Sequence, residues 1–264
     1  MVAAGAASAV VSLRNLTVSY RRHPALHHIS GSFEAGSLTA VVGPNGSGKS
    51  TLLKSIMGLV PVDGGRAGGA LQVTPLPRRI GYLPQLAEID RSFPIDVRDC
   101  VLLGCWGAAG AWGGINRSML ARIDGALGAV GLDGFARRPL SSLSSGQLQR
   151  VLFARLMVQD AELILLDEPF NAIDAQTTGA LLALVRRWHQ ECRTVIVVLH
   201  DDEQVRQHFP ATLLLARELV AWGPTSEVLT EPCLGRARAM AEAWDDDAEL
   251  CGIDGVPLRR AVAR

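Results

Sequence analysis

The sequence lacks any apolar run long enough to cross a membrane. No run reaches the roughly 18 residues that a transmembrane helix needs. The nearest case, Cys100 to Ile115, is shorter and contains five glycines. The first residues, Met1 to Ala9, carry no basic side chain, so they do not have the form of a secretory signal. We therefore expect a chain that stays in the cytosol.

The sequence also has few cysteines and no paired cysteine motif. Its five cysteines are scattered and odd in number, and no Cys-x-x-Cys occurs. This arrangement argues against a disulfide framework or a structural zinc site, and it favours reduced, mostly buried thiols. Three histidines, His23, His27 and His28, have no further ligands nearby and are interpreted as solvated turn residues.

Neither sign of charge is in excess. Lys and Arg total 26 and Asp and Glu total 26, so the formal net charge is zero. Because proteins that cover nucleic acid usually carry a basic surface, this balance argues against broad nucleic-acid binding. The 264 residues contain no internal repeat and no low-complexity linker. Their number fits one large domain or two small ones.

The strongest motif is a glycine-rich loop between a predicted strand and a predicted helix. Leu38 to Val42 is a short apolar run typical of a buried strand, and Thr51 to Met57 has apolar residues at helical spacing. Glycines let successive backbone N–H groups face a triphosphate, and the helix N-terminus adds partial positive charge. In this loop pattern the lysine reaches the β- and γ-phosphates, and the adjacent hydroxyl binds Mg²⁺. The residues predicted to bind the triphosphate are Gly43, Pro44, Asn45, Gly46, Ser47, Gly48, Lys49, Ser50 and Thr51.

Two further predicted strands end in polar residues. Leu163 to Leu166 is apolar and is followed by Asp167 and Glu168. Because ligands of parallel α/β sheets bind at the carboxyl ends of the strands, Asp167 is predicted to hold Mg²⁺ and Glu168 to polarise the attacking water. The strand predicted at Thr194 to Leu199 ends at His200, which could contact a γ-phosphate.

The order of the remaining elements predicts a largely parallel α/β core. Val11 to Tyr20 is predicted as an edge strand, with Ile29 to Phe33 as an antiparallel partner, and Leu213 to Trp222 as a hairpin around Arg217 and Glu218. The other predicted elements are a strand at Ile80 to Gln85 and helices at Val97 to Leu103, Arg117 to Val130, Ser145 to Val158, Ala175 to His189 and Leu234 to Asp247, before a tail from Glu249.

The motif in a serine-rich loop resembles that of a known family. Leu143 to Gln147 reads Leu-Ser-Ser-Gly-Gln and resembles the signature motif of ATP-binding cassette (ABC) ATPases, usually Leu-Ser-Gly-Gly-Gln. The glycine-rich loop, Gln85, Asp167 with Glu168, Asn171 to Asp174 and His200 complete the family's motifs in order. Six ordered motifs are highly specific. The resemblance covers roughly Val10 to Leu229. One departure is Ser145 in place of glycine, which costs little if φ is negative there.

The resemblance implies a fold and a domain plan. The fold is a P-loop NTPase core with a mostly parallel sheet, an N-terminal antiparallel β subdomain and an inserted α-helical signature subdomain. The ABC ATPase domain would span residues 10–232, with the helical subdomain at about 86–160. Residues 233–264 would form a C-terminal helix and tail.

The resemblance also implies a role for each motif. Tyr20 would stack on adenine, Glu168 would be the catalytic carboxylate and His200 the switch histidine. Gln85 would contact Mg²⁺ or the attacking water and sense a membrane partner; Ser50, Gln85 and Asp167 would hold Mg²⁺. Asp174 would belong to the loop that crosses to the other subunit, and Ser144, Ser145, Gly146 and Gln147 would cap the ATP of a second copy. The N-terminus of the helix predicted at Ser145 to Val158 would be a second anion site in the chain. A homodimer with two ATPs explains it, because each copy's site would serve the ATP of the other.

Two segments indicate a type of transporter. Asp90 to Gly104 and Asp167 to Asp174 resemble ATPases of bacterial zinc and manganese importers. This implies ATP and Mg²⁺ as cofactors, integral-membrane permease partners, an extracytoplasmic metal-binding protein as an indirect partner, and a peripheral place on the cytoplasmic face of the inner membrane. The uncharged Cys100 to Ile115 stretch would suit the permease contact; a packed helix followed by a flexible loop is the alternative interpretation.

One alternative stays open, and the sequence argues against two others. An importer of iron chelates or cobalamin is the nearest. A non-transport ABC ATPase of DNA repair or translation would carry long coiled coils or two cassettes, which the sequence lacks. A P-loop kinase or GTPase would lack the signature, and no Asn-Lys-x-Asp guanine motif is present.

Overall fold

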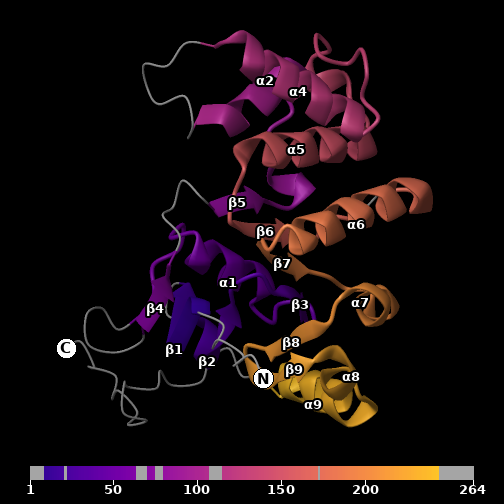
Figure 1. Ribbon diagram of the computed structural model, residues 1–264. Helices are drawn as coiled ribbons and strands as arrows, with labels where there is room; N and C mark the ends of the chain where they lie inside the picture. The colour runs from indigo at the N-terminus through magenta and orange to yellow at the C-terminus, as the bar shows by residue number, and fades with distance from the viewer. Residues whose placement is uncertain are drawn as a thin grey trace, which may run out of the picture. The chain divides into compact units, whose positions relative to one another are not determined.

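The computed structural model describes residues 9–20, 23–63, 70–74, 80–106, 115–171 and 173–243 (Figure 1). The chain divides into two units. Unit 1 takes in residues 1–34, 39–74 and 200–264, and unit 2 takes in 35–38 and 75–199. The predicted tail, the end of the last predicted helix and part of the Cys100 to Ile115 stretch lie outside the described residues.

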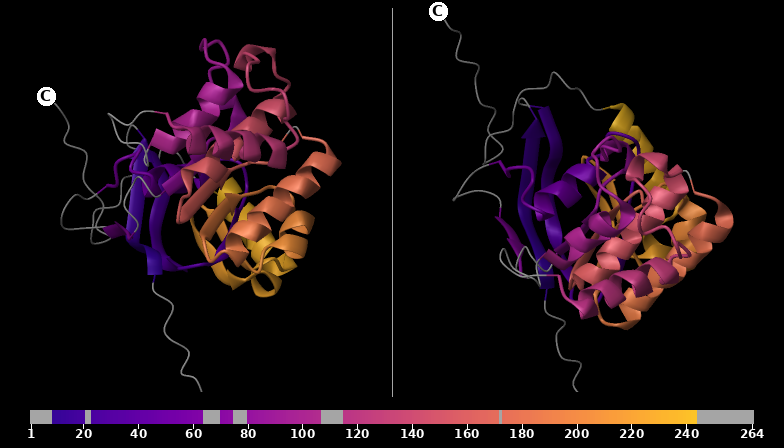
Figure 2. Two further views of the ribbon diagram at one scale, coloured as in Figure 1. Left: turned by 45° about the horizontal axis from the view of Figure 1, so that its top comes forward. Right: turned by 90° about the horizontal axis from the view of Figure 1, so that it is seen from above.

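Unit 1 begins with an antiparallel sheet of three strands. These strands are β1 (Ala9–Tyr20), β2 (His23–Glu34) and β4 (Ala70–Val73), in the order β2-β1-β4. β1 and β2 form a long paired ribbon (Figure 2). The predicted pairing is confirmed, but the prediction of β1 as an edge strand is wrong because β4 covers its other side.

The second sheet region of unit 1 carries the glycine-rich loop. β3 (Leu38–Val42) runs parallel to β8 (Ala211–Ala216), and β8 forms the predicted hairpin with β9 (Glu218–Pro224). All five β3 residues are buried, as expected for a parallel strand covered on both faces. The helices of unit 1 are α1 (Lys49–Ile56), α7 (Asp202–His208), α8 (Thr225–Val228) and α9 (Glu231–Glu242).

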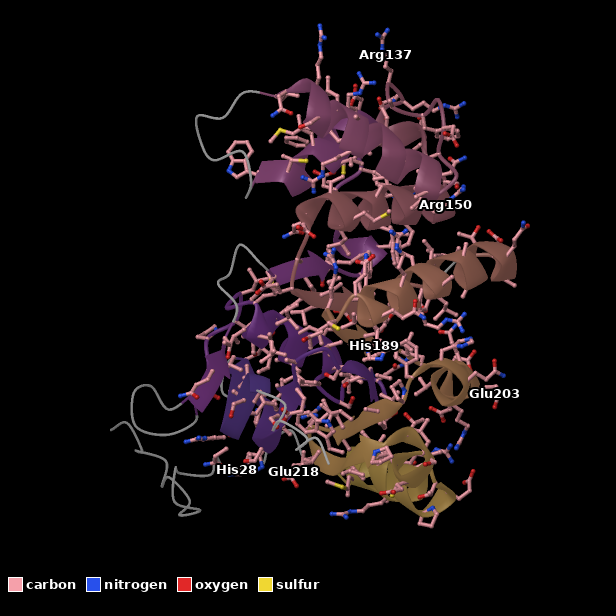
Figure 3. All side chains as sticks on the ribbon, in the orientation of Figure 1. His28, Arg137, Arg150, His189, Glu203 and Glu218 are labelled. Atoms are coloured by element: carbon pink, nitrogen blue, oxygen red, sulfur yellow. The ribbon has the colours of Figure 1, made fainter. Side chains whose placement is uncertain are left out.

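The three histidines of unit 1 lie in a strand, so their interpretation as turn residues is wrong. All belong to β2, and His27 Nδ1 lies 2.9 Å from Glu218 Oε1 on β9. His28 has a left-handed φ of 53°, and its ring bonds the Asn15 side chain. Partial burial, followed by the charge of His27, lowers the pKa of His28. Figure 3 labels His28 and Glu218.

Unit 2 holds three parallel strands and a group of helices. The strand order is β5 (Ile80–Leu83), β6 (Leu163–Asp167), β7 (Thr194–Val198), and every residue of β6 and β7 is buried. α5 (Ser145–Gln159) contacts β5, α2 (Val97–Leu102) and α4 (Arg117–Ala129), which Figure 1 shows beside it. The remaining elements are α6 (Ala175–Gln190) and the short 3₁₀ turns η3 (Leu86–Glu88), η4 (Leu103–Cys105) and η5 (Leu140–Ser142).

A buried aromatic group joins the helices of unit 2. Phe153 of α5 stacks on Trp188 of α6 with ring centroids 5.9 Å apart, and it stacks on Phe170 at 6.4 Å. Such pairs add about 0.5–1.5 kcal/mol beyond the burial of their area. This contact fixes the axis of α5, whose first residues are the signature.

Two further features are the state of the cysteines and the character of the helices. The four cysteines in the described ranges are free thiols, and two of them, Cys100 and Cys105, are buried. Burial raises the pKa of Cys100. Among the described helices, none combines the length and the apolar character that a membrane crossing requires.

Candidate nucleotide site

The glycine-rich loop leaves β3 and enters α1 through backbone angles that favour glycine. Gly43, Gly46 and Gly48 have φ values of 147°, 76° and 91°. A Cβ on Gly43 would lie 2.0 Å from the carbonyl oxygen of Leu215, and one on Gly48 would lie 2.3 Å from that of Ala25. These distances are far below van der Waals contact, so the fold itself requires both glycines.

Lys49 closes the loop on itself. Its side chain is buried at 6% exposure, and Nζ donates hydrogen bonds to the carbonyl oxygens of Gly43 and Pro44, each at 2.8 Å. Ser47 is also buried, and its carbonyl accepts from the N–H of Arg217 at 3.0 Å. The ammonium group is thus held at the centre of the loop by acceptors that a phosphate can replace.

The first turn of α1 has no side-chain cap. Gly48 is the N-cap residue, and it has no side chain that could accept a hydrogen bond from the following backbone N–H groups. Ser50 and Thr51 stand in this first turn. An uncapped helix N-terminus with a lysine in place is suited to an anion such as a phosphate group.

Two predicted residues of unit 1 are exposed. Tyr20 ends β1 and is 46% exposed, so its ring is available for stacking. His200 follows β7 and is also exposed. Their roles toward a nucleotide stay predictions.

The acidic strand end lies in unit 2. Asp167 is the last residue of β6 and is fully buried, while Glu168 takes a left-handed φ of 50°. The Asn171 amide donates to Glu168 Oε2 at 2.6 Å, and the Glu168 N–H donates to the carbonyl of Val198 at 3.2 Å. A non-glycine residue with such a φ stores about 1–3 kcal/mol of strain and is typical of functional positions. Glu168 is therefore held away from ordinary strand geometry, with its carboxylate oriented by Asn171.

Gln85 and Asp174 also have defined local positions. Gln85 directly precedes η3 and is half-buried. Asp174 is the N-cap of α6, and its Oδ1 accepts the Thr177 N–H at 2.9 Å. That hydrogen bond lowers the pKa of Asp174. Both positions are set by elements of unit 2, η3 for Gln85 and α6 for Asp174. Their roles in catalysis and subunit contact stay predictions.

The signature forms the start of α5. Ser144 Oγ accepts the Gln147 N–H at 3.2 Å, and Gln147 Oε1 accepts the Ser144 N–H at 3.0 Å, which is a capping box. Ser145 is the first helical residue, and it is not among the residues with positive φ. Serine therefore costs little at this position, in line with the expectation for a negative φ.

The described chain leaves room for a side chain at position 146, where Gly146 stands. A Cβ there would meet nothing closer than Ile173 Cγ2 at 3.9 Å, an ordinary contact. Gly146 also has no positive φ. Nothing in the described part of the chain therefore requires glycine at this position.

Sequence reasoning assigned no role to three side chains beside these motifs. Asn171 bonds Glu168, Arg91 bonds Ser145, and buried Gln149 donates to the carbonyl of Pro169 at 2.8 Å. Arg150, labelled in Figure 3, also bonds the carbonyls of Gly131 and Val130 at the end of α4. Of these, only the Asn171 contact had a sequence signal, because Asn171 lies three residues after Glu168.

The structure brings the predicted residues together in three groups. Unit 1 assembles the glycine-rich loop, and unit 2 assembles both the acidic strand end and the capped signature helix. The first group can bind phosphates. The second has the carboxylates that activate water or bind a divalent cation.

Comparison with known proteins agrees with these groups. The ABC transporter family matches residues 26–171, so the chain belongs to this family. The chain is 39% identical over 224 residues to the manganese transport system ATP-binding protein MntB of Listeria monocytogenes, covering 84% of this chain and 92% of that protein. It is 38% identical over 242 residues to the zinc transport system ATP-binding protein TroB of Treponema pallidum, covering 90% of each.

A solved structure shows the same fold. It is the inward-facing conformation of an ABC transporter described as metal-chelate type. The TM-score is 0.76 and the identity 29%, over 88% of this chain and 90% of that one. The α/β cassette with its mostly parallel sheet and its antiparallel three-stranded sheet is confirmed.

Proposed function

We propose that this chain is the ATP-binding and ATP-hydrolysing subunit of an ABC importer that powers uptake of zinc or manganese. The proposal is carried by the glycine-rich loop, which has a buried Lys49 at an uncapped helix N-terminus. The relatives named for manganese and zinc transport match this chain over nearly its whole length. Residues 10–232 would form the ATPase domain, with its helical subdomain at about 86–160, and residues 233–264 a C-terminal extension.

Within this function, each group of residues takes one step. Gly43 to Thr51 bind the triphosphate, and Tyr20 stacks on the adenine. Glu168, held by Asn171, takes the proton of the attacking water, and His200 and Gln85 contact the γ-phosphate region. The donors offered by Ser50, Gln85 and Asp167 are hydroxyl, amide and carboxylate oxygens, which fit Mg²⁺. The cation would neutralise charge on the phosphates.

The signature is proposed to complete the site in a second copy of the chain. Ser144 and Gln147 cap their own helix, so the remaining N–H groups and Gly146 are the parts left for an outside ligand. A second copy's ATP would accept hydrogen bonds there, and Asp174 would lie at the same seam. A homodimer with two ATPs would close on binding and open after hydrolysis.

The permease contact is proposed for the segment that follows Gln85. Phe93, Leu103 and Trp106 are 59%, 49% and 65% exposed, although large apolar side chains are usually buried. Aromatic residues of this kind are enriched at protein interfaces. The chain would thereby be held at the cytoplasmic face of the inner membrane. A separate extracytoplasmic metal-binding protein would deliver the cargo.

The ATPase part of the proposal is tested with Glu168→Gln. This variant should bind ATP normally, hydrolyse it at least about 100-fold more slowly, and accumulate as a dimer with ATP. Phosphate release and sedimentation velocity measure the two effects. Turnover at the normal rate would contradict the role of Glu168.

The cargo is tested in cells. Deletion of the coding sequence should lower cellular zinc or manganese, and the wild-type chain should restore it where Glu168→Gln does not. Metal content measured by mass spectrometry separates the two ions. The similarity to a metal-chelate type transporter supports a second candidate, a chelated metal as cargo. Growth that depends on a metal chelate, with normal free-ion uptake, would favour that candidate.

A further inference from the structure

The segment that follows Gln85 contains a fixed turn that directs an arginine. The Asp90 carboxylate accepts hydrogen bonds from the Ser92 N–H at 2.8 Å and from the Ser92 hydroxyl at 2.6 Å. These bonds lower the pKa of Asp90. Arg91 lies within this turn, and the turn therefore fixes its backbone.

Arg91 reaches the signature across a long separation in sequence. Its Nη2 donates a hydrogen bond to Ser145 Oγ at 3.0 Å, and the two residues are 54 positions apart. Both are half-buried. A glycine, the usual residue at this position of the motif, has no side chain to accept this bond. The departure at Ser145 is therefore what allows Arg91 to hold the loop.

The same segment is attached to the chain on the other side of the signature loop. The Leu140 N–H donates to the carbonyl of Ile95 at 3.2 Å, and the Val97 N–H donates to that of Arg138 at 3.0 Å. Asp96 and Pro139 form an isolated β-bridge. Backbone bonds thus tie the segment to the entrance of the loop, and the Arg91–Ser145 bond ties it to the start of α5.

The charge of Arg91 makes this second attachment sensitive to ligands. Within the described part of the chain, no carboxylate forms an ion pair with Arg91. Its guanidinium stands beside the N-terminus of α5, where the helix dipole is also positive. An anion that binds at this helix N-terminus would be attracted by both positive charges.

We propose that Arg91 is a positioning residue that, through Ser145, fixes the signature loop to the segment 86–96 and prepares the loop for the ATP of the second copy. This inference rests on the proposed function, because it takes the signature to bind that ATP. If the membrane partner displaces the segment 86–96, the displacement reaches the N-terminus of α5 through the backbone bonds to residues 138–140 and through the Arg91–Ser145 bond. By the same coupling, ATP bound at the signature changes the position of the segment.

The test compares four variants of the full-length chain, each also made with Glu168→Gln. Arg91→Ala and Ser145→Ala should each raise the ATP concentration for half-maximal dimer formation about fivefold. The double variant should match either single variant, because each single substitution already removes the Arg91–Ser145 hydrogen bond. Arg91→Lys keeps a charged donor and should stay nearer to wild type. Sedimentation measures the dimer, and a fluorescent ATP analogue in dilute protein should bind all variants equally.

A matched control removes a similar bond at the other end of α5. Arg122 Nη2 donates to the carbonyl of Val158 at 2.8 Å, and Arg122→Ala should leave the ATP dependence of the dimer unchanged. Hydrogen exchange adds a readout of coupling. Amides of residues 86–96 should exchange more slowly on ATP-driven dimer formation, and Ser145→Ala should reduce this protection.

Three results would overturn the inference. These are effects of Arg91→Ala and Ser145→Ala that multiply in the double variant, an Arg122→Ala effect of the same size, or unchanged protection of residues 86–96 in Ser145→Ala. Failure of the proposed function looks different. In that case the Glu168→Gln chain with an intact Arg91 would form no ATP-dependent dimer at all.

Discussion

The glycine-rich loop and the signature loop both end at the N-terminus of a helix, but the chain constrains them differently. At the first, neighbouring backbone requires Gly43 and Gly48, and no side chain caps α1. At the second, Ser144 and Gln147 cap α5, and Gly146 has open space around it. The first loop is shaped by its own chain for a ligand. The second is capped by its own residues, and nothing in the described chain requires its glycine.

The largest expected effect comes from breaking the first loop. Gly43→Ala should lower the free energy of unfolding by about 3 kcal/mol or more, because the new Cβ meets a backbone oxygen that cannot move aside. ATP binding should be lost with it. Urea unfolding and titration with a fluorescent ATP analogue measure both.

Gly46→Ala is the matched control for that loop. A Cβ added to Gly46 would meet no atom within 4 Å, and only the φ of 76° opposes alanine. The cost should be about 1–2 kcal/mol. Equal losses for Gly43→Ala and Gly46→Ala would mean that contact with Leu215 is not what constrains the loop.

The next effect is on affinity. Lys49→Ala should weaken ATP binding about 100-fold, or about 2.7 kcal/mol, since the charged hydrogen bonds to the phosphates are lost. Lys54→Ala, on the same helix but outside the loop, should bind ATP as the wild type does. Isothermal titration calorimetry compares the two, and an unchanged affinity for Lys49→Ala would rule out the phosphate role.

The capping of the second loop should have a smaller effect. Ser144→Ala removes half of the capping box and should destabilise the chain by about 1 kcal/mol. Ser142→Ala is the control, because the Ser142 hydroxyl donates to the carbonyl of Pro139 and caps no helix. Thermal unfolding should separate the two variants, and similar melting temperatures would show that the cap contributes little.

The smallest effect on stability should come from the second loop's glycine. Gly146→Ala should raise the free energy of unfolding by about 0.5 kcal/mol, as alanine is the better helix residue. In the Glu168→Gln chain it should nevertheless prevent ATP-dependent dimer formation. Gly125→Ala on α4, where no atom lies within 4 Å, should gain similar stability and keep the dimer. A dimer that survives Gly146→Ala would remove the contrast between the loops.

Local sequence patterns predicted most of the fold, and the errors have local causes. Buried strands such as β6 and β7 were predicted within one or two residues, because four or five consecutive apolar or β-branched residues leave little alternative. β4 has four residues beside a Pro/Gly loop and gave no periodic signal, so the central position of β1 was missed. α7 has seven residues and no long apolar stripe, and it was missed for the same reason.

The site was predicted as motifs, and its internal contacts were not. A motif places Lys49, Glu168 or Ser144 by spacing along the chain. The bond from Arg91 to Ser145 depends on the folded path of 54 residues, which spacing does not contain. Asn171 lies close enough in sequence to Glu168 that a turn after β6 could have suggested their contact.

The backbone hydrogen bond between Val97 and Arg138 bears on which residues of the chain can change in sequence. The polypeptide leaves at one of these residues and returns at the other, with the two ends 3.0 Å apart from nitrogen to oxygen. The residues between them therefore leave and return at one place, and α2 and α4 among them pack on α5. Exposed side chains of this region, such as Leu103 and Trp106, can change with the protein that they contact, while the buried ones keep α5 in place. A chimera that takes residues 98–137 from a relative should therefore bind the relative's membrane partner and keep the ATPase residues of this chain.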